Sequence, residues 1–150
     1  MNTFRPFWKE TRYCPSILLV TEDCGRVNRV KQWLEAEGCQ VYGVNIHNVN
    51  ELLHACRNIL FDLIVLNIEA SELDPSAEMG KTLRSLYKNL KAAPALLTLP
   101  MVVMTACDDV KAAIEKLAVR RVYSVGQDEV AHSTLLQTIE QVHYLTYRYV

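Results

Sequence analysis

Carboxylate and amide side chains follow two short apolar runs of this chain. Glu22 and Asp23 come just after the run at 17–20, and Asn67 ends the run that starts at residue 61. Carboxylates are ligands that Mg²⁺ prefers, and a carboxylate can attack a phosphoryl group. An amide has no charge to hold a cation, and its lone pair is shared with its own carbonyl. Asn67 therefore lacks the chemistry that a carboxylate would bring to this position.

Further polar residues stand close to similar apolar runs. Thr105 follows the run at 101–104 and offers a hydroxyl, and Glu69, Glu72 and Asp74 make the segment after Asn67 acidic. We interpret these acids as solvated loop carboxylates. The alternative is that one of them serves as a substitute phosphoryl acceptor or metal ligand.

Five short apolar segments alternate with amphipathic patterns of helical period, which predicts a doubly wound α/β fold. The predicted strands are 17–20, 40–44, 61–67, 101–104 and 121–125. Helical stripes are formed by Val27, Val30 and Leu34 before Gly38; by Val49, Leu52, Leu53 and Cys56 after a cap at Asn48 or Asn50; by Met79, Leu83, Leu86 and Leu90; by Val110, Ala113, Ile114 and Leu117; and by Leu135, Ile139, Val142 and Leu145 after a cap at Ser133 or Thr134. Parallel strands need such helical crossovers. We expect a flavodoxin-like five-stranded parallel sheet in the order 2-1-3-4-5, with helices on both faces.

The chain has 150 residues and half of them are hydrophobic, which suits one compact domain. We expect a domain at 16–150 after an N-terminal arm at 1–15, which mixes aromatic with basic residues. The arm is interpreted as a tail that lays its aromatic residues on the domain, and the alternative is a docking peptide for a partner.

Charge, cysteines and hydropathy exclude several classes of protein. The net charge is −1, from 16 basic and 17 acidic residues, so we expect no direct binding to nucleic acid. The five cysteines have no metal-binding or disulfide-framework spacing and are interpreted as reduced core thiols. No apolar stretch is long enough to span a membrane, and residues 1–15 lack the apolar centre of a signal peptide. We expect a cytoplasmic protein that does not bind membranes.

In sheets of this type the site lies where the carboxyl ends of the strands meet. The residues there form the segments TED at 21–23, N at 67, TA at 105–106 and VG at 125–126. Together with the apolar strands before them, they resemble the CheY-like receiver domain of two-component response regulators, in a degenerate, pseudo-receiver form. The resemblance covers about 15–145.

The departures from the family pattern fall on the residues that do its chemistry. Thr21 takes the first acidic position and Glu22 the second, and Asn67 takes the place of the phosphoacceptor aspartate. Val125 and Gly126 stand where the family has a lysine and a proline. The resemblance thus implies that Asn67 is not phosphorylated, because positioning and charge compensation carry nearly all of this catalysis.

Two remnants of the family site remain. Thr105 matches the switch hydroxyl, although a threonine at a strand end also bonds locally or to water. Glu22, Asp23 and Glu69 are the remnant acids, and the first two are the candidate ligands for a weak Mg²⁺ site. We expect no catalytic residue, no cofactor and no enzymatic activity.

Phosphorylation-independent signalling through protein binding is therefore the function that the resemblance implies. The partner would be a histidine kinase, an output protein or a second copy of the chain. Candidate contact residues, near the last strand and the last helix, are Arg120, Arg121, Tyr123, Tyr144 and Tyr147.

Two alternatives remain open. One is a flavodoxin-like sensor of a small molecule or cofactor, although the acids at 22–23 would repel phosphate and no glycine-rich phosphate loop occurs. The other is a receiver that is phosphorylated at a non-standard acid such as Glu69.

Overall fold

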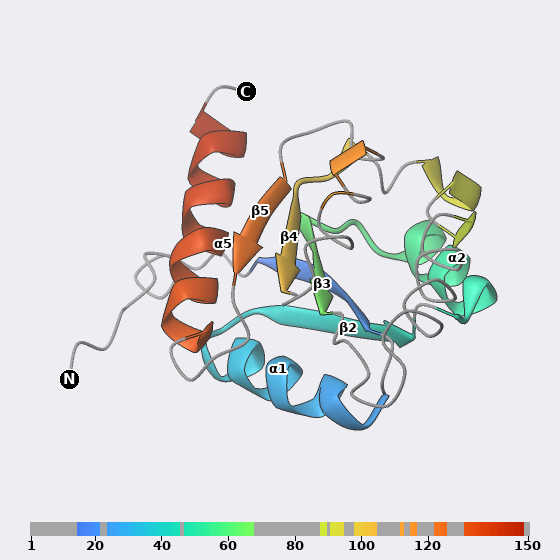
Figure 1. The fold of residues 1–150 in the computed structure, drawn as a ribbon, viewed down its shortest axis with the longest axis horizontal. Coiled ribbons are helices and arrows are strands. Elements are labelled where there is room, and N and C mark those ends of the chain that lie inside the picture. The colour runs from blue at the N-terminus through green and yellow to red at the C-terminus, as the bar shows by residue number, and fades with distance from the viewer. Residues whose placement is uncertain are drawn as a thin grey trace.

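The computed structural model describes residues 15–21, 24–45, 47–67, 88–89, 91–94, 98–104, 112, 115–116, 122–125 and 131–148, with the side chains of 24–28, 131–132 and 143–148 excepted. Within these ranges the chain alternates between strands and helices (Figure 1). The elements are β1 (Ser16–Thr21), α1 (Cys24–Ala36), β2 (Gln40–Asn45), α2 (Val49–Asn58), β3 (Leu63–Asn67), β4 (Met101–Met104), β5 (Val122–Val125) and α5 (Ala131–Arg148).

The strands form one parallel sheet in the order β2-β1-β3-β4-β5, which confirms the predicted architecture. The central strands are almost wholly covered: β3 and β4 are buried along their entire length. A strand buried on both faces needs apolar side chains at consecutive positions, which is why these strands appear in the sequence as continuous apolar runs.

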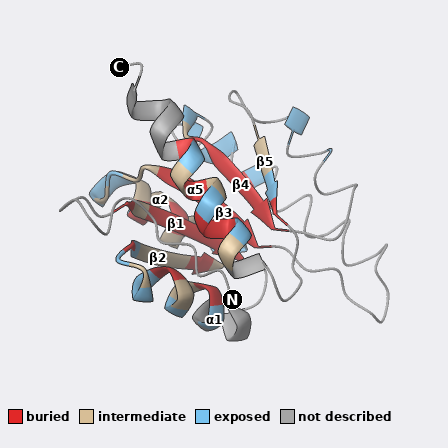
Figure 2. Cartoon of the chain, turned by 90° about the vertical axis from the view of Figure 1, so that its left-hand side faces the viewer, coloured by how far each residue is buried: buried red, intermediate tan, exposed pale blue. Residues whose placement is uncertain are grey.

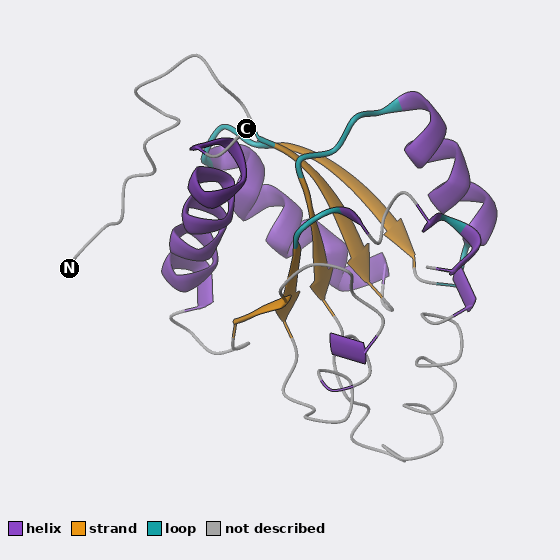
Figure 3. Cartoon of the chain, turned by 90° about the horizontal axis from the view of Figure 1, so that it is seen from above, coloured by secondary structure: helices purple, strands orange, loops and turns teal. Residues whose placement is uncertain are grey.

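Helices lie on both faces of the sheet (Figure 3), and each face carries one hydrophobic cluster. The first joins Leu18, Ile64 and Val103 to Leu52 and Ala55 of α2. The second joins residues of odd number in β1 and β3 to α1 and α5, and its members include Ile17, Leu19, Leu63, Val65, Leu34, Leu135 and Ile139. Alternate side chains of a strand point to opposite faces, so the pleat assigns each residue to one cluster.

The predicted end of the first helix at Gly38 is confirmed. Gly38 has φ 91°, and its N–H donates to the carbonyl of Glu35 at 3.0 Å. The N–H of Cys39 donates to the carbonyl of Leu34, also at 3.0 Å. These two bonds make a Schellman motif, in which glycine supplies the left-handed residue. Leu34 and Cys39 are both buried in the second cluster, so the motif also fixes the start of β2 against α1.

Asn48, and not Asn50, caps α2. Its side-chain oxygen accepts a hydrogen bond from the N–H of Glu51 at 3.2 Å, and its side-chain nitrogen donates to Glu51 Oε2 at 3.1 Å. Replacing Asn48 by alanine should lower the free energy of unfolding by about 0.5–2 kcal/mol, because an orphan N–H loses its partner. Urea denaturation measures this. The matched control is Asn50→Ala, an exposed asparagine in the first turn of the same helix, which should change stability by less.

The predicted third strand began too early in the chain. β3 starts at Leu63. The two residues before it, Phe61 and Asp62, contact residues of β1 and β2 instead of extending β3. Asp62 exchanges two hydrogen bonds of 2.7 Å with Ser16, from its N–H to the Ser16 carbonyl and from the Ser16 N–H to its carboxylate. Phe61 packs edge-on against Tyr42, with ring centroids 6.4 Å apart. Residues that continue a strand's hydrophobic pattern just before its first residue therefore need not belong to the strand.

Several predicted features lie partly or wholly outside the described residues. The arm is described only at Pro15, and the stripes at 79–90 and 110–117 are represented by short helical pieces at 88–89, 91–92 and 115–116.

Burial raises the pKa of the Cys56 thiol, as expected for a thiol packed against the core. In the described part of the chain, no helix is long and apolar enough to cross a membrane.

Candidate functional site

The last residues of the strands stand side by side at one edge of the sheet. Thr21, at the end of β1, pairs in register with Asn45 of β2 and with Asn67 of β3. Asn67 pairs with Met104 of β4, and Met104 with Val125 of β5. Because the strands are parallel, this row marks the carboxyl edge of the sheet, where α/β folds of this order place their sites. We call these five residues the strand-end row.

All five side chains of the strand-end row are uncharged, and its centre is closed to solvent. Thr21 is 1% exposed and Asn67 is 4% exposed, and neither is without a partner. Met104 and Val125 are also buried and belong to the second hydrophobic cluster. A carboxylate at so covered a position requires a cation or several donors, since burial disfavours its charged form. Threonine and asparagine can be buried here because they carry no charge.

The pleat places the centre of the row on the side of α1 and α5. Thr21 follows Ile17 and Leu19 at alternate positions of β1, and Asn67 follows Leu63 and Val65 in the same way along β3. Those four apolar residues belong to the cluster that α1 and α5 cover. The two polar side chains thus continue an apolar face up to the edge of the sheet.

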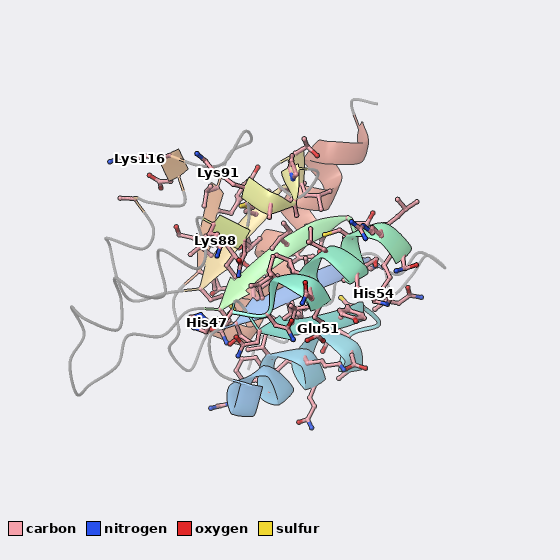
Figure 4. The ribbon with its side chains drawn as sticks, turned by 90° about the vertical axis from the view of Figure 1, so that its right-hand side faces the viewer. His47, Glu51, His54, Lys88, Lys91 and Lys116 are labelled. Carbon is pink, nitrogen blue, oxygen red and sulfur yellow. The ribbon has the colours of Figure 1, made fainter. Side chains whose placement is uncertain are left out.

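Asn45, at the outer end of the row, starts the turn into α2. Its side-chain oxygen accepts from the N–H of His47 at 2.8 Å, and its carbonyl accepts from the N–H of Asn48 at 3.0 Å. An asparagine that bonds two residues ahead makes an Asx-turn. Figure 4 shows His47 at this turn, apart from Glu51 and His54 on α2. The bonded oxygen of Asn45 is thus committed to the backbone turn.

The structure describes the side chains of four of the residues that the sequence singled out, and the first is Thr21 at the end of β1. Asn67 ends β3 as predicted, Val125 ends β5, and Tyr123 is half-buried in β5, packed against the second cluster. Part of the Tyr123 ring surface is therefore already covered within the domain. The backbones of Tyr144 and Tyr147 lie in α5, without described side chains. Outside the described residues lie Glu22, Asp23, Glu69, Thr105, Arg120 and Arg121.

Asn45 and Met104 were not recognised as site residues from the sequence. Asn45 lies one position beyond the predicted second strand, and Met104 was assigned to a strand without regard to its place at the edge. Both join the site only through strand register, which pairs residues distant in the chain. The signal that could have found Asn45 is the N-x-x-N spacing at 45–48 before a helix, typical of turn and cap asparagines.

No group of three or more histidine, cysteine, aspartate or glutamate side chains that could hold a metal ion occurs among the residues that the structure describes. The remnant acids of the sequence, Glu22, Asp23 and Glu69, lie outside the described residues. Within the strand-end row, oxygen ligands come only from neutral groups, which bind Mg²⁺ more weakly than carboxylates do.

Solved structures similar to this chain include receiver domains and response regulators. A CheY-like response regulator receiver domain protein from Methanospirillum hungatei is 19% identical with a TM-score of 0.61, covering 92% of this chain and 100% of that chain. The signal receiver domain of an HD domain-containing protein from Pseudomonas fluorescens is 14% identical with a TM-score of 0.62, covering 91% and 99%. The response regulator TrrA from Thermotoga maritima, solved in complex with Mg²⁺-BeF, is 18% identical with a TM-score of 0.56, covering 85% and 98%.

The sequence itself matches no protein-family model and no curated protein. The likeness is therefore one of architecture: strand order and parallel pairing agree with the fold of the matched structures, while the identities remain below 20% in those three. The chain has the fold of CheY-like receiver domains.

Proposed function

We propose that this chain is a receiver-like signalling domain of the two-component type that acts by binding proteins, without phosphorylation. The observation that carries the proposal is the position of Asn67. It ends the central strand β3, between Thr21 and Met104 of the neighbouring strands, where the resemblance assigns the phosphoacceptor aspartate.

The chemistry of the strand-end row supports the same proposal. Phosphoryl transfer in this fold depends on an acceptor carboxylate, a cation held by acids and a second positive charge. The resemblance assigns Asn67, Thr21 and Val125 to three of the corresponding places, and none of these side chains can carry a charge. Three neutral residues at the centre and end of one edge favour a coordinated loss of the reaction over a single substitution.

The proposed contact surface consists of α5 with β5 and the residues around them. Candidate contacts are Arg120, Arg121, Tyr123, Tyr144 and Tyr147, since aromatic residues and arginine are enriched in interface cores. The fold also occurs in the receiver domain of a histidine kinase from Syntrophus aciditrophicus and in full-length FixJ of B. japonicum, of which the match covers 59%. Kinases, output proteins and a second copy are thus the partners to test.

Incubation of the protein with Mg²⁺ and a small phosphodonor should leave its intact mass unchanged, because Asn67 offers no nucleophilic carboxylate. Intact-protein mass spectrometry measures this. A receiver domain with an aspartate at the end of its third strand, treated in parallel, must gain one phosphoryl group and so shows that the donor is active.

A stoichiometric phosphoryl adduct on this chain would contradict the proposal. Its position, mapped by peptide mass spectrometry, would then identify the substitute acid, with Glu69 the first candidate. A small molecule or chromophore retained through purification would instead support the sensor alternative.

A further inference from the structure

Helix α5 carries a buried carboxylate oxygen that has no hydrogen-bond partner among the described residues. This atom is Oε2 of Glu140, whose side chain is half-buried. Its neighbour Ile139 and Leu136, one turn before it, are buried in the second hydrophobic cluster. Glu140 thus lies at the border of the covered face of α5, which Figure 2 shows in front of the sheet.

An oxygen in this position requires a donor. Buried polar atoms of native proteins are almost always hydrogen-bonded, and a charged carboxylate is the most costly atom to leave unpaired. The described cations of α1, which shares the second cluster with α5, already have contacts. The guanidinium of Arg29 lies 4.9 Å from the centre of the Trp33 ring, and Lys31 Nζ lies 3.9 Å from Glu35 Oε1.

The N-terminal arm has the chemistry that the unpaired oxygen calls for. Residues 1–14 carry three basic side chains against a single acidic one, together with several aromatic rings; these residues are Arg5, Lys9, Arg12, Glu10, Phe4, Phe7, Trp8 and Tyr13. A basic side chain of the arm could pair with the Glu140 carboxylate, while the arm's aromatic rings pack on the apolar residues beside it.

The arm joins the domain at the edge of the sheet toward which the second half of α5 runs. Pro15, a buried residue, stands directly before β1 at the amino edge of the sheet. α5 runs antiparallel to β5, so its second half returns toward that same edge (Figure 1). Fourteen extended residues reach about 45 Å, more than the roughly 27 Å length of α5, so chain length does not prevent contact.

We propose that the N-terminal arm docks on α5, with Arg5, Lys9 or Arg12 pairing with the carboxylate of Glu140. The contact is an intramolecular ion pair flanked by the arm's aromatic rings. Because α5 belongs to the partner surface proposed above, the arm would compete with a partner for that surface. This consequence rests on the proposed function, whereas docking of the arm does not.

Limited digestion with chymotrypsin tests the docking, since the arm supplies aromatic cleavage sites at Phe7, Trp8 and Tyr13. In the wild-type protein these sites should be cut slowly. Glu140→Gln should accelerate cleavage by about tenfold or more, the change expected when a charge-assisted hydrogen bond is lost. The matched control is Glu35→Gln, an exposed glutamate on α1, which should leave the rate unchanged. Circular dichroism checks that both variants are folded.

Equal cleavage rates in the wild type and in Glu140→Gln would overturn the proposal, as would a wild-type arm cut as fast as a free peptide of residues 1–14. Protection that depends on protein concentration would assign the surface to a second copy and also overturn it. A charge exchange keeps the test independent of folding defects. In a Glu140→Lys background, one of Arg5→Glu, Lys9→Glu or Arg12→Glu should restore protection; restoration by none of them refutes the ion pair. The phosphodonor experiment is unaffected by any of these outcomes.

Discussion

Replacing Asn67 by aspartate should destabilise the protein at neutral pH by about 2–4 kcal/mol, because the new carboxylate would be buried and its partners in strand register are uncharged. Asn67 is 4% exposed, and its register partners are Thr21 and Met104. Burial raises the pKa of such a carboxyl above that of an unfolded aspartate, so the folded state binds the proton more tightly. The variant should therefore be nearly as stable as the wild type in acid and lose stability as pH rises through the raised folded pKa.

Urea denaturation of both proteins at acidic and at neutral pH measures this difference. The matched control is Asn45→Asp, the same change in the same strand-end row. Asn45 is half-buried, and an aspartate there can still accept a hydrogen bond from the N–H of His47. Asn45→Asp should therefore lose less stability than Asn67→Asp, and that loss should depend less on pH. A variant Asn67→Asp that is as stable as the wild type at neutral pH would show that this edge of the sheet tolerates a charge.

Added Mg²⁺ tests whether Glu22 and Asp23 can form a cation site together with the new carboxylate at position 67. If Glu22 and Asp23 reach the new carboxylate, Mg²⁺ should recover part of the stability lost in Asn67→Asp, because a bound cation stabilises the state that binds it. We expect the recovery to grow when Thr21→Asp is added, which restores the first acidic position. Absence of any Mg²⁺ effect in the double variant would mean that the acids at 22–23 do not face the strand-end row.

Leu66→Ala should lower the free energy of unfolding by about 2–5 kcal/mol, the second large effect that we expect. Leu66 is fully buried in the central strand β3, where it pairs in register with Val20 and Val103. All three residues belong to the cluster that α2 covers, so a shortened side chain leaves a cavity between the sheet and that helix.

Leu60→Ala is the matched control for this change. Leu60 lies six residues earlier, between α2 and β3, and is 94% exposed. The same chemical change there should alter stability by no more than about 0.5 kcal/mol. Equal losses in the two variants, measured by urea denaturation with unchanged slopes, would place Leu66 outside the core and contradict the two-cluster architecture.

Much of the fold could be predicted because its signals are local. A strand buried on both faces must be apolar at consecutive positions, and 101–104 meets that condition so fully that its bounds agreed with the structure. The stop at Gly38 was equally local, since a Schellman motif needs a residue at positive φ. Local pattern was less informative where two residues of the same type could serve equally well, as with Asn48 and Asn50, of which only Asn48 caps α2.

One error arose where a tertiary contact overrides local pattern, and another where one residue type can take two local roles. Residues 61–62 continue the apolar and alternating run of β3, but Asp62 bonds to Ser16, which lies 46 residues away. The last helix was expected to start with a cap at Ser133 or Thr134, yet α5 already begins at Ala131. Inside the helix, Thr134 uses its carbonyl to accept a bond from the hydroxyl of Thr138 at 2.8 Å. A threonine can cap a helix or lie within it, and its sequence neighbours did not decide between the two.

By itself the sequence determined the residue types at the ends of the strands, and with them the absence of a carboxylate at position 67. It also determined the alternation of strands and helices, because hydrophobic period depends on neighbours in the chain. Only the tertiary structure decided that Thr21, Asn67 and Met104 stand in one row and that the centre of this row is buried. Register and burial arise from contacts between strands far apart in sequence, which no local pattern encodes.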